Sequence, residues 1–156
     1  MDASISKWCG AALRVLDRWA DVGPLVVRIV FGYFWFETGF AKIQNLDGFT
    51  NRFVEWGIPF PHFNAALSAW TETIGGAFIF LGLFTRLTAV PMIVNMIVAI
   101  ALVVIKNVGS VDDFVELDEV VYILIFFWLL MAGPGRYSLD HLLARSLGIE
   151  REPASR

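Results

Sequence analysis

Two acidic residues, Glu37 and Glu72, lie inside strongly apolar stretches of the sequence. A charge at the centre of a membrane helix costs at least about 2.5 kcal/mol, so such residues normally face the protein interior and find a partner there. At about 1.5 Å of rise per residue, both acids lie at a similar depth. If the two carboxylates meet in a medium of low dielectric, repulsion and desolvation favour a shared or bound proton. A quinone site or another proton-coupled site could use this chemistry.

Basic and polar residues near these acids could complete such a site. Arg28 is nine residues before Glu37, which at about 100° per residue places the two on opposite sides of one helix. Arg28 therefore needs another partner or extends to the membrane interface, and Lys42 has the same interfacial alternative. We assign Glu37 and Glu72 as candidate catalytic residues. The candidate cofactor-binding residues are Arg28, Lys42, Trp70, Asn95 and Arg86. The alternative is that buried polar groups only hold helices together.

Other kinds of chemistry find little support in the sequence. Cys9 is the only cysteine, which excludes internal disulfides and thiolate-cluster metal sites. His62 and His141 have no second ligand at metal-binding spacing, so we predict no metal site. No phosphate-binding glycine loop and no serine or cysteine nucleophile motif occurs. The net charge of −3 and the absence of a basic block argue against nucleic acid as a partner.

Four apolar stretches must position these residues. They cover residues 25–43, 65–84, 87–105 and 114–132, and a helix needs about 20 apolar residues to cross the hydrocarbon core of a bilayer. Hydrophobic residues make up 57% of the chain and charged residues 17%, a balance unusual for soluble proteins. The sequence therefore predicts an all-α fold, a four-helix transmembrane bundle in the lipid bilayer.

The residues before the first span have the pattern of a helix that lies on the membrane surface, because apolar side chains recur at helical spacing among charged ones. We divide the chain into an N-terminal amphipathic interfacial helix (1–21), a membrane domain (22–142) and a polar tail (143–156). Most basic residues fall on the side that holds both termini, so the positive-inside rule predicts that the termini are cytoplasmic. The larger connections, residues 44–64 and 106–119, then lie on the opposite side.

Several short motifs occur in the order that is typical of one family. They are Arg28-Ile-Val-Phe-Gly32, Gly39-Phe-Ala-Lys42, Glu72-Thr-Ile-Gly75-Gly76, Gly82-Leu-Phe-Thr-Arg86 and Gly133-Pro-Gly-Arg-Tyr-Ser-Leu-Asp140. Over residues 25–142 the chain resembles the DoxX family. The resemblance implies a small multi-pass protein of the bacterial cytoplasmic (inner) membrane, with relatives that accompany quinone-linked sulfur or oxidative-stress systems. The segments 58–61 and 110–115 resemble the branch encoded beside copper-responsive, modified metal-binding peptides.

Two functions remain open at this point. The first is a subunit of a quinone-linked membrane redox system, in which a polar intramembrane pocket binds the quinone as cofactor. Such a subunit needs a partner protein, because the sequence contains no visible electron carrier. The alternative is a non-catalytic membrane accessory that binds a protein partner through its non-cytoplasmic loops, for maturation, export or handling of a metal-binding peptide. Whether the chain is an oxidoreductase enzyme stays open, and a homo-oligomer is compatible with the sequence.

Overall fold

The computed structural model describes residues 13, 15, 17 and 19–149. This part of the chain is helical and contains no β-strand, which confirms the all-α prediction. The four long helices are α2 (Val22–Gln44), α4 (Pro61–Leu81), α5 (Thr85–Leu102) and α7 (Asp118–Ala132). The shorter ones are α3 (Leu46–Glu55), the 3-10 helix η1 (Val104–Asn107), α6 (Val111–Val115) and α8 (Leu139–Ser146). Each predicted span overlaps one long helix.

Two predicted boundaries differ from the described helices. The fourth span was predicted to begin at residue 114, whereas α7 begins at Asp118, because Leu117 is extended and separates α6 from α7. Helix α8 continues into the predicted polar tail, which begins at residue 143, and Ala144 is buried. The predicted interfacial helix, residues 1–21, lies almost entirely outside the described residues.

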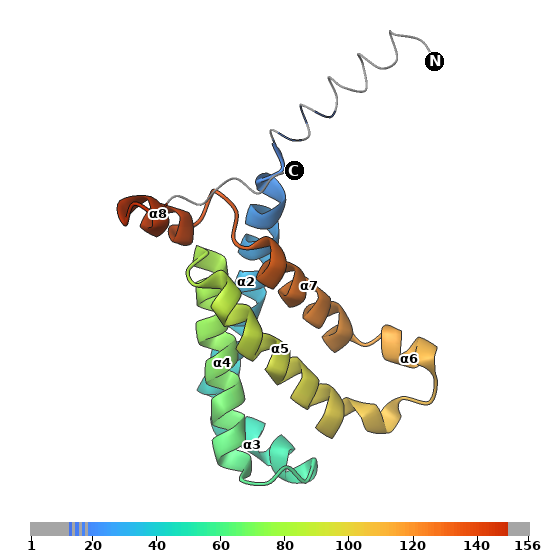
Figure 1. Cartoon of the computed structure of the whole chain (residues 1–156). Coiled ribbons are helices and arrows are strands. Elements are labelled where there is room, and N and C mark those ends of the chain that lie inside the picture. The colour runs from blue at the N-terminus through green and yellow to red at the C-terminus, as the bar shows by residue number, and fades with distance from the viewer. Residues whose placement is uncertain (1–12, 14, 16, 18, 150–156) are drawn as a thin grey trace, which may run out of the picture.

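The long helices are arranged as two pairs. Helix α2 lies along α4, and α5 lies along α7 (Figure 1). Helices α5 and α7 lean away from α2 and α4 towards α6, whereas α8 lies at the opposite end of α5. Helix α3 lies beside the first part of α4, where Phe53 and Ile58 pack on Ala65.

Glycines bring the backbones of α2 and α4 into direct contact. A methyl group at Gly32 would lie 2.5 Å from the backbone nitrogen of Phe80, and one at Gly39 would lie 2.5 Å from the nitrogen of Thr73. On the facing side, a methyl group at Gly76 would meet the backbone of Phe36. Small residues at such contacts are typical of helices that associate in lipid, where close packing replaces the hydrophobic effect.

The four long helices share one core. Side chains from α2, α4, α5 and α7 form a continuous cluster of Phe31, Trp35, Ile79, Ala89, Met92, Met96, Phe126 and Leu129. Aromatic rings join α2 to α7, since the Phe31 centroid lies 4.9 Å from Phe126 and the Trp35 centroid lies 5.2 Å from Tyr122. Outside this core, many large apolar side chains on the long helices are exposed, as expected for surfaces in contact with lipid.

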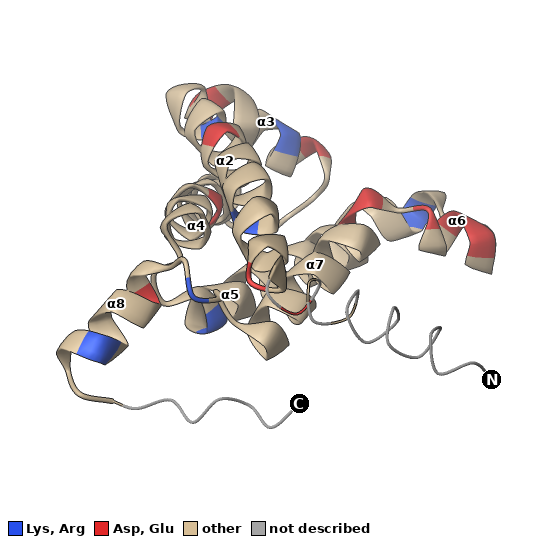
Figure 2. Ribbon diagram, turned by 90° about the horizontal axis from the view of Figure 1, so that it is seen from above, with Lys and Arg blue, Asp and Glu red and all other residues tan. Residues whose placement is uncertain are grey.

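The long helices differ in whether their length and hydropathy are sufficient to cross a membrane. Of the residues that the structure describes, only α5 is long and apolar enough to cross a membrane by length and composition alone, and 28% of this stretch is buried in the molecule. Helix α7 has 15 residues, and α2 and α4 contain charged side chains. The crossing of those three helices stays a prediction. Figure 2 shows that acidic positions gather on and beside α6, while α3 carries charges of both signs.

The contact between α2 and α4 can be tested with one methyl group. We expect Gly76→Ala to lower the melting temperature of the detergent-solubilised protein, because the added carbon meets the backbone of Phe36 rather than a flexible side chain. Gly23→Ala is the matched control, since nothing lies within 4 Å of the added carbon there. Alanine favours a helix over glycine by about 1 kcal/mol, so the control should melt at or above the wild-type temperature. Equal melting of Gly76→Ala and Gly23→Ala would contradict the backbone contact.

Candidate functional site

The most buried carboxylate of the described residues is paired with a lysine. Glu72 lies in the middle of α4 and only 2% of its surface is exposed. Lys42, in the last turn of α2, places its Nζ atom 2.8 Å from Oε1 and 2.5 Å from Oε2 of Glu72. The pair therefore joins the two helices that the glycines hold in contact.

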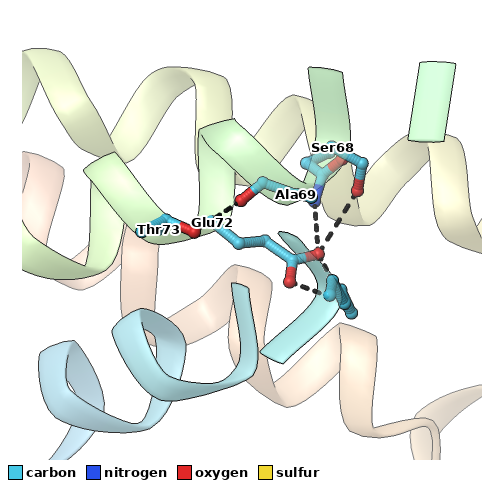
Figure 3. Close-up of polar contacts among 6 residues, drawn as sticks. Ser68, Ala69, Glu72 and Thr73 are labelled. Carbon is cyan, nitrogen blue, oxygen red and sulfur yellow. Dashed lines mark hydrogen bonds and ion pairs between the residues drawn. The ribbon is translucent and has the colours of Figure 1, made fainter. Parts of the chain in front are cut away.

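Two further donors complete the surroundings of this carboxylate. The Asn95 side-chain nitrogen, from α5, lies 3.1 Å from Glu72 Oε1, and the Ser68 hydroxyl lies 3.3 Å from the same oxygen. Figure 3 shows the Glu72 side chain extending from α4 with Ser68 one turn away. An ionised carboxylate only accepts hydrogen bonds, so an ammonium, an amide and a hydroxyl suit its charged form. We call Lys42, Glu72 and Asn95 the polar cluster.

The polar cluster lies in the wall of a large cavity. This cavity has a volume of about 820 Å³ and is lined by residues of α2, α3, α4, α5 and α7, most of them apolar. Several lining side chains on α5, such as Val90 and Val94, are also exposed on the molecular surface, so the cavity opens sideways towards the surroundings of the bundle. Trp35 lines it too, and its buried indole nitrogen has no hydrogen-bond partner. The cavity thus combines an apolar interior with charged groups in its wall.

The expected meeting of Glu37 and Glu72 does not occur. Glu37 is exposed and lines a second hollow of about 510 Å³ between α2 and α3, together with Asn45 and Arg52. Residues 37–39 of α2 do lie at about the height of Glu72, because Gly39 lies against the backbone at Glu72 and Thr73. The Glu37 side chain, however, points away from α4, since the side of α2 that faces α4 carries Gly32, Gly39 and Lys42.

Arg28 is buried at the opposite end of the bundle, so extension to the interface is the wrong alternative. Its guanidinium donates to four backbone carbonyls, with Nε 3.1 Å from Ile79 O and Nη1 3.0 Å from Tyr137 O. The other two acceptors are Pro134 O and Phe80 O. Arg28 therefore links α2 to the end of α4 and to the segment after α7. It takes no part in the polar cluster.

Two more candidate residues lie away from the cavity. Trp70 is 52% exposed on α4 and lines neither hollow. Arg86 is exposed at the start of α5, where its guanidinium donates to Met131 O at 3.1 Å. Of the residues assigned from the sequence, the structure brings together Lys42, Glu72 and Asn95.

Sequence reasoning missed several residues at this site. Thr38 and Ser68 contribute hydroxyl groups to the lining of the cavity, and the signal for Ser68 was its position four residues before Glu72, one helical turn away. Trp35 and Tyr122 line the cavity as well, but a tryptophan or tyrosine in a membrane helix more often belongs to a core or an interface. Only the three-dimensional arrangement separates these cases.

The acidic run at residues 112–119 has a local structural role. The Ser110 hydroxyl accepts from the amide of Asp113, whose carboxylate accepts from the amides of Gly109 and Ser110, a capping box that begins α6. The Gly109 hydrogen bond, followed by those of Ser110, holds the pKa of Asp113 below its usual value. In the described part of the chain, no three His, Cys, Asp or Glu side chains gather as metal ligands.

The buried ion pair can be tested with a double-mutant cycle. Lys42→Met and Glu72→Gln should each lower the melting temperature, because removal of one partner leaves the other buried group unpaired at a cost of roughly 3 kcal/mol. The double variant should lose less than the sum of the single losses, since no unpaired charge remains.

An exposed ion pair provides the control for this cycle. Arg136 and Asp21 lie 3.4 Å apart with 76% and 28% of their side chains exposed, and such pairs contribute about 0–1 kcal/mol. Arg136→Gln should therefore leave the melting temperature nearly unchanged. Strict additivity of the Lys42 and Glu72 losses would show that the two side chains do not interact.

Comparison with known proteins identifies the family of this chain. The family model of DoxX matches residues 23–105. "Uncharacterized membrane protein Rv3486" of Mycobacterium tuberculosis is 30% identical over 143 residues, which cover 85% of this chain and 88% of the relative. "Inner membrane protein YqjF" of Escherichia coli is 30% identical over 128 residues, 82% of this chain and 97% of the relative.

A third relative carries the name of an activity. "Putative oxidoreductase CatD" of Bacillus subtilis is 35% identical over 91 residues, which cover 58% of this chain and 66% of the relative. No solved structure matches the chain. The DoxX model matches more than half of the chain, and the two membrane relatives match more than four fifths of it. The chain therefore belongs to the DoxX family of membrane proteins.

Proposed function

We propose that this protein binds a quinone in the cavity between its long helices, as a membrane subunit of a quinone-linked redox system. The observation that carries the proposal is the polar cluster in the wall of an otherwise apolar cavity. Small-molecule sites typically have volumes of about 300–1,000 Å³ and apolar linings with a few convergent polar groups. The volume of about 820 Å³ falls within this range.

The polar groups suit both redox states of a quinone ring. The carbonyl oxygens of the oxidised ring accept hydrogen bonds, which Lys42 and Asn95 can donate. The hydroxyls of the reduced ring donate hydrogen bonds, which the Glu72 carboxylate can accept. The aromatic side chains of Phe34 and Tyr122 in the lining can pack against a flat ring.

The way into the cavity suits a ligand that is dissolved in lipid. Val90, Val94 and Val98 of α5 line the cavity and are each about half exposed on the outside of the bundle. A ligand with an apolar tail can therefore enter from the bilayer and leave its tail between lipid chains. Water-soluble substrates would meet an apolar entrance there.

The electrons must be supplied by a partner protein, because the sequence shows no haem-ligand pair, cysteine cluster or flavin signature. The relative named as a putative oxidoreductase, CatD, supports a redox role. We place the protein as a multi-pass component of the bacterial inner membrane with both termini in the cytoplasm. The loop that contains α6, on the opposite side, is the surface that we assign to a partner.

Extraction of the purified protein tests the proposal. Protein solubilised in mild detergent should release quinone, detected by mass spectrometry, in a near-stoichiometric amount. Glu72→Gln should bind quinone about tenfold or more weakly and so retain less of it, because the loss of a charge-assisted hydrogen bond weakens binding by about 1.5–3 kcal/mol. Glu37→Gln is the matched control, since it makes the same chemical change at a carboxylate outside the cavity, and it should retain wild-type amounts.

Two results would overturn this function. One is the absence of quinone from the wild-type protein together with no binding of a short-chain quinone, followed by quenching of tryptophan fluorescence. The other is equal loss of quinone in Glu37→Gln and Glu72→Gln. In either case the non-catalytic accessory becomes the better reading, and capture of a partner through residues 44–64 and 106–119 is the next experiment.

A further inference from the structure

We propose that the second hollow is a water-filled chamber through which the polar cluster exchanges protons with solution, with Lys42 as the connecting group. The purpose of this chamber rests on the proposed quinone function. The second hollow is lined by Glu37, Thr38, Ala41, Lys42, Asn45, Gly48, Phe49 and Arg52. This assigns a role to Glu37 that differs from direct contact with a cofactor.

The charges in the second hollow require water. Glu37 lies seven residues before the end of α2, about 10 Å along the helix. Among the described residues, neither Glu37 nor Arg52 forms an ion pair, although both line this hollow. An unpaired charge in lipid costs at least about 2.5 kcal/mol at the centre of a helix, and water entering the protein removes much of that cost. Water in the hollow therefore explains how Glu37 is tolerated.

The two hollows share a wall made of Thr38, Lys42 and Phe49. Lys42 reaches both sides of this wall, because its ammonium contacts Glu72 while 27% of its side chain is exposed, against 3% for Glu72. Its Nζ atom also lies 5.0 Å from the centroid of the Phe49 ring, close enough for a cation–π contact. An ionisable group thus connects the quinone cavity with the outer hollow, and a ring beside it restricts the passage.

The opposite end of the bundle offers no comparable path in the described residues. Arg28 is 2% exposed there and its donors are taken up by backbone carbonyls. A methyl group at Gly82 would lie 2.5 Å from the Arg28 guanidinium, and Ser138 is buried beside it. Close packing at this end excludes water. The polar route out of the cavity therefore leads past Lys42 towards α3.

The route has a defined task in quinone chemistry. Reduction of a quinone to a hydroquinone takes up two electrons and two protons, and the electrons come from a dehydrogenase partner. The protons reach the ring oxygens from Lys42 and the groups around it, and water in the second hollow returns them to Lys42. Glu37 exchanges protons between this water and the solution beside α3. Oxidation of the hydroquinone sends both protons along the same route in reverse. Glu37 is a positioning residue in this scheme, since it touches no substrate.

Access of water can be measured without any quinone. In full-length Cys9→Ser protein, a single thiol is introduced at Thr38, in the shared wall, or at Phe40, which stacks on Phe36 and lines neither hollow. The proteins are reconstituted in vesicles of phosphatidylethanolamine and phosphatidylglycerol. They are then treated with a charged methanethiosulfonate, which reacts with thiolates and does not enter lipid. Phe40 is two residues closer to the end of α2, so depth alone would favour its reaction.

We expect Thr38→Cys to react about tenfold or more faster than Phe40→Cys, since thiolates form where water is present. Reaction of Phe40→Cys at the same or a higher rate would overturn the proposal. Elution profiles of both variants, matched to that of the Cys9→Ser parent, ensure that only folded protein is compared.

Failure of this inference and failure of the quinone function are distinguishable. If quinone copurifies with the protein but the Thr38→Cys variant is unreactive, the quinone cavity is supported and the water-filled chamber is contradicted. A reactive Thr38→Cys variant in a protein that binds no quinone would support a water-filled chamber and contradict its role in quinone chemistry.

A second thiol tests whether Lys42 separates the two hollows, because Asn95→Cys lies in the quinone cavity. Its reaction should be slow with Lys42 present and several-fold faster with Lys42→Ala, and an unchanged rate would show that Lys42 does not separate the hollows.

Discussion

The contact between the backbones of α2 and α4 is the constraint on which the rest of the structure depends. Glycines at positions 32, 39 and 76 leave no room for a side chain between these helices. This contact fixes the height and rotation of α2, so the lysine three residues after Gly39 meets Glu72. Once that pair is placed, α5 supplies Asn95 from the other side. The polar cluster is a consequence of packing geometry, because each of its three residues comes from a different helix.

The two ends of α2 show two ways of keeping a charge inside a bundle. Among the described residues Arg28 forms no direct ion pair, and its guanidinium instead donates to carbonyls at the end of α4 and after α7. Lys42 at the other end meets an opposite charge and borders two hollows. The first arrangement uses its four hydrogen bonds for structure. The second leaves a charged pair next to empty space, and that difference separates a structural role from a functional one.

The sequence was sufficient for the four long helices and for the family, and less so for the site. Runs of apolar residues located every long helix, because they reflect local chemistry. The shorter helices α3, η1, α6 and α8 were not predicted. The site depended on the direction in which each charge points. Arg28, Trp35 and Lys42 are seven residues apart in turn, which places them on one side of α2, and this spacing could have selected Lys42 over Glu37. No pattern of neighbouring residues in the sequence could reveal the cavity, because it arises where α5 and α7 lean away from α4 in three dimensions.

The shortness of α7 bears on how this protein fits its membrane. Fifteen helical residues extend over about 22 Å, whereas the hydrocarbon core of a bilayer is about 30 Å thick. A bilayer crossed by α7 would become thinner along this side or draw flanking side chains towards the interface, and each ångström of mismatch costs a fraction of a kcal/mol. That strain is relieved when two short faces meet, or when the protein collects where the membrane is thin. The helix that closes one side of the cavity would in this way also influence where in the membrane the protein resides and which neighbours it keeps.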